Sequence, residues 1–226
     1  MKALKFLAFL VGAIIILPAC SSDDDEKEPE VDLRKEFVYC PDIQHPHIID
    51  MGEAGKWSCC NVGAINPTDY GNYYAWGETG TKESYTRTTY KHYIDKGNPP
   101  YKEIGENIQS SEYDAATESW KSPWKMPTRN QMEALINTCS HEWVSISGVN
   151  GYVFTSPAGN SIFLPAGGRY NTKTNDGVNV NGYYWTSTSS PDSQENSYAH
   201  FLFFDENSPR MKEGNRVLGN NIRPIQ

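Results

Sequence analysis

The second half of the chain alternates short apolar runs with polar, glycine-containing segments, a pattern typical of short strands joined by loops. The apolar runs predict strands at 152–155, 161–164, 183–187, 198–204 and 217–225. The first two runs flank the turn sequence Pro157-Ala158-Gly159-Asn160 and therefore predict a β-hairpin. The polar segments 171–181 and 188–197 predict loops.

Helical periodicity is scarce. Thr128 and Gln131 have the spacing of a capping box at the start of a helix. Apolar residues then recur on one face of this helix, at Met132, Leu135 and Ile136. A shorter helix is expected at about 111–120. Few helices, many short strands and long loops predict an α+β fold, and the absence of a second linker after residue 36 predicts a single domain over 36–226.

The first 35 residues have a different pattern. Lys2 and Lys5 precede an apolar run at 6–17, which is the anatomy of a secretory signal and is short for a membrane span. The tetrad Leu17-Pro18-Ala19-Cys20 resembles the bacterial lipobox. This resemblance implies a signal peptide at 1–19 and lipid on Cys20, whose several acyl chains (palmitate among them) give stable anchoring. An ordinary cleaved signal or an anchor helix is the alternative.

Residues 20–35 read as a lipidated cysteine and an acidic tether. The run Ser21-Ser22-Asp23-Asp24-Asp25-Glu26 will remain solvated, and a plain spacer explains it. The run also resembles the surface-export signal of Bacteroidetes lipoproteins. Ser21 directly after Cys20 does not match the inner-membrane retention signal. These resemblances imply a lipid-anchored protein of the cell outer membrane that faces the cell exterior.

Charge limits the class of partner. Removing Lys2 and Lys5 from the 20 basic residues leaves 18 against 28 acidic residues, a net charge near −10. Nucleic-acid binding requires clustered Lys and Arg, and the sequence has no such cluster. The expected partners are the membrane, through the lipid anchor, and a polysaccharide or surface protein.

Four cysteines remain after Cys20: Cys40, Cys59, Cys60 and Cys139. An even number of cysteines in an oxidising compartment favours disulfides. A Cys59–Cys60 bridge needs a strained ring, so two of the three pairings remain, in which one of these two residues pairs with Cys139 and the other with Cys40. A zinc site that adds His45 and His47 is the alternative, but it lacks a recognised ligand spacing, and no metal site is predicted.

Several phrases appear in a fixed order from residue 48 to residue 226. They are Trp57-Ser58-Cys59-Cys60-Asn61-Val62-Gly63-Ala64, Tyr73-Tyr74-Ala75-Trp76-Gly77-Glu78-Thr79, Trp124-Lys125-Met126-Pro127-Thr128, Gly159-Asn160-Ser161-Ile162-Phe163-Leu164-Pro165-Ala166-Gly167-Gly168, Tyr184-Trp185-Thr186-Ser187 and Ile222-Arg223-Pro224-Ile225. In this order they resemble the Fibrobacter succinogenes major paralogous domain of Bacteroidetes surface lipoproteins. That family is similar to C-type-lectin-like folds, among them formylglycine-generating enzymes and variable ligand-binding proteins. The resemblance implies a twisted antiparallel sheet with one or two helices and a long loop-rich half.

Large and small residues fit such a fold. Tryptophans are expected to fill the core where regular structure is thin, at Trp57, Trp76, Trp124, Trp143 and Trp185. Gly63, Gly167 and Gly168 are expected where the backbone is left-handed or closely approached.

No catalytic constellation is recognisable. The cysteine phrase of formylglycine-generating enzymes is missing, because the last cysteine is Cys139. The sugar-binding phrases of C-type lectins are also missing, since Thr186-Ser187-Thr188 follows Trp185. No cofactor is predicted. The polar loop still offers oxygen ligands for Ca²⁺, at Asn171, Asn175, Asp176, Asn179 and Asn181.

We therefore predict a non-catalytic ligand-binding or adhesion module for a glycan or a protein. The polar and aromatic composition of 170–198 suits adaptable contacts and stacking on sugars. The first candidate residues are Tyr170, Asn179, Asn181 and Tyr183. The alternatives are a structural cell-envelope component without a small ligand, and an enzyme related to the formylglycine-generating folds.

Overall fold

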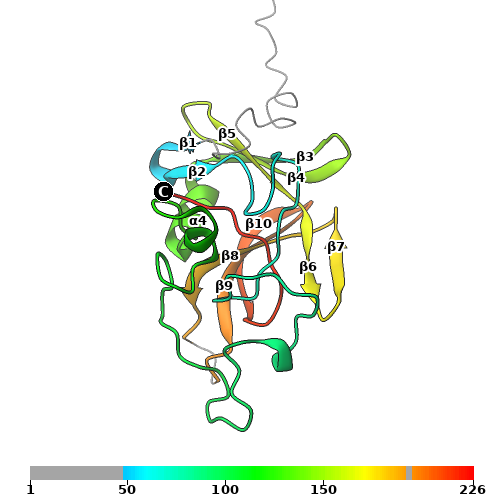
Figure 1. The fold of residues 1–226 in the computed structure, drawn as a ribbon. Helices are drawn as coiled ribbons and strands as arrows, with labels where there is room; N and C mark the ends of the chain where they lie inside the picture. Colours follow the sequence, from blue (N-terminus) through cyan, green and yellow to red (C-terminus); the bar gives the residue numbers. More distant parts are fainter. Residues whose placement is uncertain (1–47, 192–194) are drawn as a thin grey trace, which may run out of the picture. The chain divides into compact units, whose positions relative to one another are not determined.

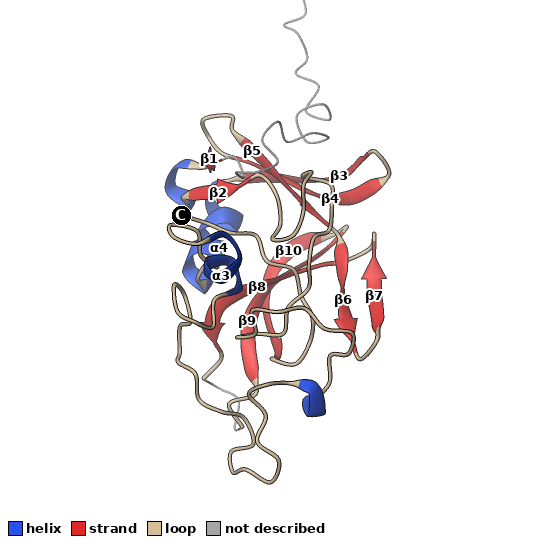
Figure 2. Ribbon diagram, in the orientation of Figure 1, coloured by secondary structure: helices blue, strands red, loops and turns tan. Residues whose placement is uncertain are grey.

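The fold is mostly β with two short α-helices, as seen in a computed structural model that describes residues 48–191 and 195–226 (Figures 1 and 2). These described residues all belong to one compact unit. The helices are α3 (Ala115–Trp120) and α4 (Arg129–Thr138). Two single 3₁₀ turns are η2 (Gly52–Ala54) and η3 (Arg87–Thr89). The sequence-based prediction of antiparallel sheet with one or two helices is confirmed at this level.

The described strands form three sheets. One pairs β1 (Ile48–Asp50) with β2 (Lys56–Ser58). A second has the order β3 (Ser140–Ile146), β4 (Val149–Thr155), β5 (Ser161–Pro165). The third curls into a half-barrel with the order β10 (Ser208–Asn215), β9 (Tyr198–Asp205), β8 (Gly182–Ser189), β6 (Gly167–Asn171), β7 (Thr174–Val178). Its strands pair antiparallel, except for a single parallel contact between Gly168 in β6 and Gly182 in β8.

Local sequence explains why α4 begins where predicted. The hydroxyl of Thr128 accepts a hydrogen bond from the backbone N–H of Gln131 at 3.2 Å, and Gln131 Oε1 accepts one from the N–H of Thr128 at 2.9 Å. This capping box satisfies two N–H groups that a helix leaves without partners. Met132 and Leu135 are then buried on the inner face of the helix. The predicted α4 is confirmed.

The buried carboxylate of Asp114 starts α3. It accepts hydrogen bonds from the N–H groups of Ala116 and Thr117, at 2.9 and 3.0 Å, and from the N–H of Met126 at 2.9 Å. The predicted helix at 111–120 is therefore present in a shorter form. Because Met126 lies just before α4, this one side chain also fixes the position of α4 relative to α3.

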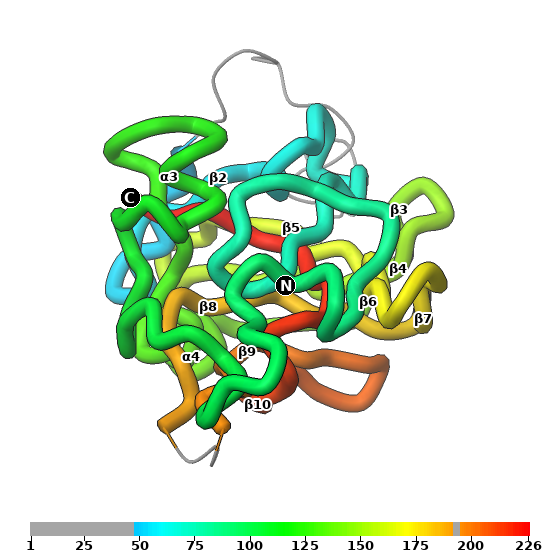
Figure 3. Tube along the Cα trace, turned by 60° about the horizontal axis from the view of Figure 1, so that its bottom comes forward, coloured from blue at the N-terminus to red at the C-terminus, as the bar shows by residue number. Residues whose placement is uncertain are grey.

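Two sequence-based expectations are wrong, and one strand was not predicted at all. The segment 171–181 contains β7, an edge strand whose exposed polar residues look like a loop in the sequence. The charged strand β10 was missed for the same reason. The segment 217–225 (red in Figure 3) is not a strand, because it changes partner every few residues: it bridges Tyr170 at Gly219, Tyr74 at Asn220 and both Trp57 and Lys125 at Ile225.

The central strands β8 and β9 of the half-barrel are largely buried on both faces, and residues along each strand alternate between these faces. Tyr184 and Leu202 point into a core shared with α4 and with β4 and β5. Trp185 and Phe201 point into a second core with Trp76 and α3. A fully buried side chain of this size contributes about 2 kcal/mol or more to stability.

The predicted core tryptophans are confirmed, with one difference. Trp57, Trp76 and Trp185 are 0% exposed and Trp124 is 8% exposed, whereas Trp143 only packs against the core from its edge. The indole N–H groups of Trp57, Trp76 and Trp185 all donate to backbone carbonyls, as for Trp76, which donates to the Thr186 carbonyl at 2.8 Å.

The predicted glycines are also confirmed. Gly63 and Gly168 have φ values of +83° and +66°, which other residues rarely adopt. A Cβ atom on Gly167 would lie 2.5 Å from Oδ1 of Asn221, so this position has no room for a side chain.

Candidate functional site

The structure separates the two tyrosines that the sequence placed in one site. The guanidinium of Arg169 lies 4.6 Å from the ring centroid of Tyr183, so these residues share one face of the sheet. Tyr170 follows Arg169 in β6 and therefore points to the opposite face. Tyr170 and Tyr183 thus belong to two different surfaces.

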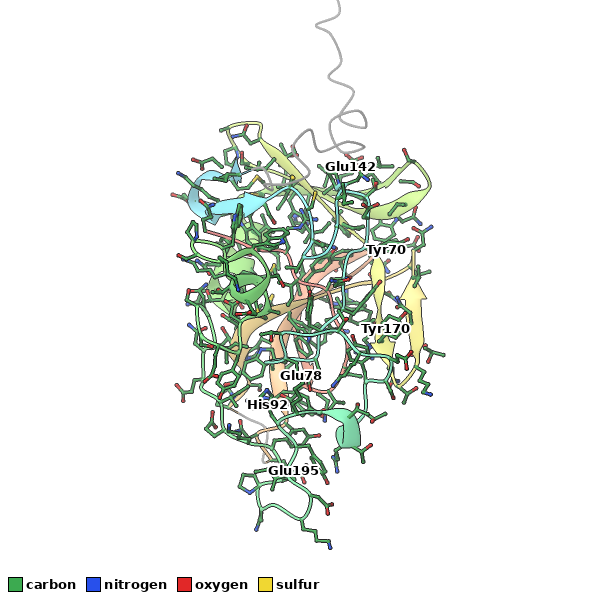
Figure 4. All side chains as sticks on the ribbon, in the orientation of Figure 1. Tyr70, Glu78, His92, Glu142, Tyr170 and Glu195 are labelled. Carbon is green, nitrogen blue, oxygen red and sulfur yellow. The ribbon has the colours of Figure 1, made fainter. Side chains whose placement is uncertain are left out.

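Tyr170 belongs to a group of aromatic side chains that we call the tyrosine cluster. Its members are Tyr73, Tyr85, Tyr90, Tyr93, Tyr101 and Tyr170. Tyr170, labelled beside β6 in Figure 4, stacks on Tyr85 with ring centroids 5.4 Å apart and contacts Tyr73 edge-on at 5.0 Å. Tyr85, Tyr90 and Tyr101 are buried, whereas Tyr73, Tyr93 and Tyr170 are half-buried. The tyrosine cluster therefore consists of three buried rings and three rings that are partly exposed to solvent.

Backbone hydrogen bonds hold the rings in place. The hydroxyl of Tyr73 donates to the Gly167 carbonyl at 2.5 Å, and that of Tyr85 donates to the Tyr73 carbonyl at 2.6 Å. Main-chain pairing of Tyr85 with Thr172 joins the loop-rich half to the end of β6. A ring held at both its backbone and its hydroxyl loses little further entropy when a ligand binds.

Burial also keeps these phenols neutral. It raises the pKa of Tyr73 to about 12 and the pKa of Tyr85 to about 12. Both hydroxyls therefore remain hydrogen-bond donors over the whole physiological pH range, and the cluster presents no phenolate charge.

A buried ion pair packs against the buried rings of the tyrosine cluster. The carboxylate of Glu78 is almost fully buried and lies 2.8 Å from Nζ of Lys82, and it also accepts a hydrogen bond from the N–H of Lys91 at 2.7 Å. Nζ of Lys82 is 5.4 and 5.6 Å from the ring centroids of Tyr85 and Tyr90. The segment 78–91 is thereby fixed although it has no α-helix or strand and contains only the short 3₁₀ turn η3.

Arg87 covers the outer end of the cluster. Its Nε donates to the hydroxyl of Tyr101 at 3.2 Å, and its guanidinium is 5.9 Å from the ring of Tyr93. The Arg87 side chain is 53% exposed. Its Nη2 lies 3.8 Å from Oε2 of Glu195, a long ion pair between two surface side chains. Arg87 therefore offers N–H donors to solvent beside half-buried rings.

The two predicted asparagines have structural contacts. Asn179, with φ of +64°, accepts a hydrogen bond from the N–H of Asn150 at 2.6 Å and donates to the Gly148 carbonyl at 3.1 Å. The carbonyl of Asn181 accepts a hydrogen bond from the N–H of Gly168 at 2.8 Å. Asn179 thus ties the turn before β8 to the turn between β3 and β4, away from the tyrosine cluster.

Two of the residues predicted as Ca²⁺ ligands have other contacts. Asn175 donates to the Gly167 carbonyl at 3.2 Å, and Asp176 pairs in register with Arg169 across β6 and β7. Within 48–191 and 195–226, no three His, Cys, Asp or Glu side chains are grouped as a metal site requires. Ca²⁺ binding stays a prediction.

The cysteines are divided between two places. Cys139 is buried in the core beside α4, 3.9 Å from the hydroxyl of Thr138, and burial raises its thiol pKa. Cys59 and Cys60 lie in a separate cluster with their sulfur atoms 3.4 Å apart. No disulfide occurs among the described residues, so the structure lacks the predicted bridge from this pair to Cys139. The remaining predicted positions, Cys20, Cys40, His45, His47 and segments 1–19 and 20–35, lie outside the described residues.

Most of the tyrosine cluster was missed from the sequence. A signal was present, because seven of the 14 tyrosines fall between residues 70 and 101. This density lies in a segment without strand or helix periodicity, so nothing local shows that the rings meet Tyr170.

Comparisons of the chain with protein-family models, curated proteins and solved structures returned no match. In the part of the chain that the structure describes, no helix has the length and apolar character needed to cross a bilayer. The function is therefore argued from the sequence patterns and from the geometry of the cluster.

Proposed function

We propose that this protein is a lipid-anchored lipoprotein of the outer membrane surface, and that its domain is a non-catalytic module that binds glycans at the tyrosine cluster. The observation that carries the binding proposal is the half-buried ring of Tyr170, supported on one side by Tyr85. Sugars present flat C–H surfaces that pack on aromatic rings, and their hydroxyls need nearby polar partners.

The surroundings of Tyr170 fit this chemistry. Phenol oxygens and backbone carbonyls supply acceptors next to the rings, and the exposed guanidinium of Arg87 supplies donors. The rings are fixed before binding, which reduces the entropy lost on association. A neutral or weakly polar glycan therefore matches the cluster better than a strongly charged ligand does.

We also propose that the fold is C-type-lectin-like. This assignment rests on the ordered sequence phrases and on the meeting of the two ends of the described chain. Trp57 in β2 bridges Ile225, and the N–H of Gln226 donates to the Lys56 carbonyl at 2.9 Å. An experimental structure in which β2 and the C-terminal segment lie apart would contradict it.

The glycan proposal predicts a specific loss of binding on an array of bacterial and host polysaccharides. The full-length protein should bind a subset of neutral glycans, and Tyr170→Ala should lose at least about tenfold in affinity, equivalent to about 1.4 kcal/mol. Tyr198→Ala is the matched control, because Tyr198 is 41% exposed and lies outside the cluster. If the protein bound no polysaccharide, a structural role in the envelope would be favoured instead.

The anchoring proposal predicts that native protein carries acyl chains on Cys20. Mass spectrometry of the N-terminal peptide should show the added lipid, and Cys20→Ser should move the protein out of the membrane fraction. An unmodified sulfur at Cys20 in native material, or an unchanged distribution of the Cys20→Ser variant, would refute anchoring without bearing on glycan binding.

A further inference from the structure

Cationic and aromatic side chains form a row across the half-barrel sheet, on the face opposite Tyr170. We call it the cation–aromatic row: Arg169 in β6, Tyr183 in β8, Phe203 in β9, and Arg210 and Lys212 in β10. Tyr183 pairs in register with Phe203, and Phe203 with Arg210. The strands β8, β9 and β10 follow one another in Figure 3. At about 4.8 Å between neighbouring strands, the row extends over roughly 14 Å.

The cations lie directly on the rings. The guanidinium of Arg169 is 4.6 Å from the Tyr183 centroid, that of Arg210 is 4.6 Å from the Phe203 centroid, and Nζ of Lys212 is 4.0 Å from the same ring. The two rings contact each other at 5.1 Å. A ring holds a cation in place through its quadrupole but neutralises none of its charge.

Two of the three cations are not paired with a carboxylate. Nη2 of Arg210 lies 2.8 Å from Oδ2 of Asp205. This contact holds the pKa of the Asp205 carboxyl well below its usual range. Within the described residues, neither Arg169 nor Lys212 has a carboxylate oxygen within 4.0 Å. Asp176 faces Arg169 in register and Asp205 is paired with Arg210, so the three cations of the row exceed the adjacent carboxylates by one, in a chain whose net charge is −8.

We propose that the cation–aromatic row is a second binding site, which takes a linear acidic polysaccharide bearing sulfate or carboxylate groups. It goes beyond the proposed function, because it lies on another face and needs an anionic ligand. A row of fixed cations matches a line of anionic groups, and the N–H groups of Arg169 and Lys212 remain available to bind oxygens.

Two other polyanions fit the row less well. Single-stranded nucleic acid needs open ring faces for base stacking, but cations cover both rings here. An anionic membrane surface is bound by basic residues flanked by apolar side chains that insert, but Phe203 is only 7% exposed. The acidic polysaccharide is therefore the occupant that the charges and the covered rings favour.

The test measures binding of the full-length protein to dextran sulfate, with uncharged dextran of equal length as the reference probe. We expect binding to dextran sulfate alone, weakened by added salt, and a loss of at least tenfold in the double variant Arg169→Gln, Lys212→Gln. The double variant Lys56→Gln, Lys91→Gln makes the same charge change at exposed residues away from the row and should bind within twofold of the parent. Tyr170→Ala should also keep its binding, which separates this site from the glycan site.

Every other result overturns the proposal. Equal losses in the two double variants would mean that only net charge matters. Tighter binding to a single-stranded oligonucleotide or to phosphatidylglycerol vesicles than to dextran sulfate would assign the row to another partner. If the Arg169 change prevents folding, the single variant Lys212→Glu replaces the double variant, because Lys212 is exposed. An unchanged affinity of Lys212→Glu for dextran sulfate would refute the site.

Discussion

Replacing Arg223 with methionine is expected to lower the free energy of unfolding by about 4 kcal/mol, the largest effect of any single polar substitution considered. The guanidinium is 0% exposed. It donates to Oδ1 of Asn61 at 2.9 Å and to the carbonyls of Ser58, Cys59 and Phe163 at 3.1, 2.9 and 2.8 Å. Removal deletes four buried hydrogen bonds, at about 1–3 kcal/mol each, which outweighs the relief of burying one charge less.

Urea unfolding of the parent and the variant measures this difference. Arg87→Met is the control, because the Arg87 side chain is 53% exposed and its loss should leave the free energy of unfolding nearly unchanged. A loss below about 1 kcal/mol in Arg223→Met would contradict the structural role given to the C-terminal segment. That segment joins β2, the loop at 72–76 and β8 through its backbone, and Arg223 is its most connected side chain.

Gly182→Ala is expected to destabilise the protein by about 3 kcal/mol or more, because the new methyl group has no space. A Cβ atom at this position would lie 2.0, 2.3 and 2.5 Å from three ring carbons of Phe204. Phe204 faces Gly182 in register from β9, is fully buried and stacks against Tyr184. The ring also contacts Trp143 and Tyr152, so its displacement disturbs the core and we expect β8 and β9 to separate locally.

Gly80→Ala provides the matched control for this substitution. No atom lies within 4 Å of a Cβ on Gly80, and its φ is not in the left-handed region. We expect a change of a few tenths of a kcal/mol at most, by thermal or urea unfolding. Equal stabilities of Gly182→Ala and Gly80→Ala would show that β8 and β9 are not packed as described.

Elements defined by neighbouring residues were predictable from the sequence. The capping box of Thr128 and Gln131 and the hairpin turn at 157–160 act within a few residues, so their signal is complete in the sequence. Aromatic core positions such as Trp185 were predictable for a related reason, because a large apolar side chain has few favourable places outside a core.

Elements defined by distant partners were not predictable. Polar edge strands such as β7 keep one side unpaired, so their exposed residues give no apolar alternation. The segment 217–225 has the composition of a strand, but its bridges go to five residues that are distant in sequence: Trp57, Tyr74, Lys125, Tyr170 and Tyr184.

The candidate site shows the same limit. Tyr170 was identified from local composition, whereas its contacts with Tyr73 and Tyr85 join residues 97 and 85 positions apart. The separation of Tyr170 from Tyr183 follows from strand alternation, and it became visible only once Arg169 was seen to lie on Tyr183. One predicted loop surface is thus replaced by two surfaces with different chemistry.

Calorimetric titration of the strongest array glycan into the parent, Tyr170→Phe and Tyr170→Ala tests the central claim most directly. Tyr170→Phe keeps the ring that stacks on Tyr85, so it should bind within about threefold of the parent, whereas Tyr170→Ala should lose at least about tenfold. Undiminished binding by a folded Tyr170→Ala variant would contradict the claim that glycans bind at the tyrosine cluster.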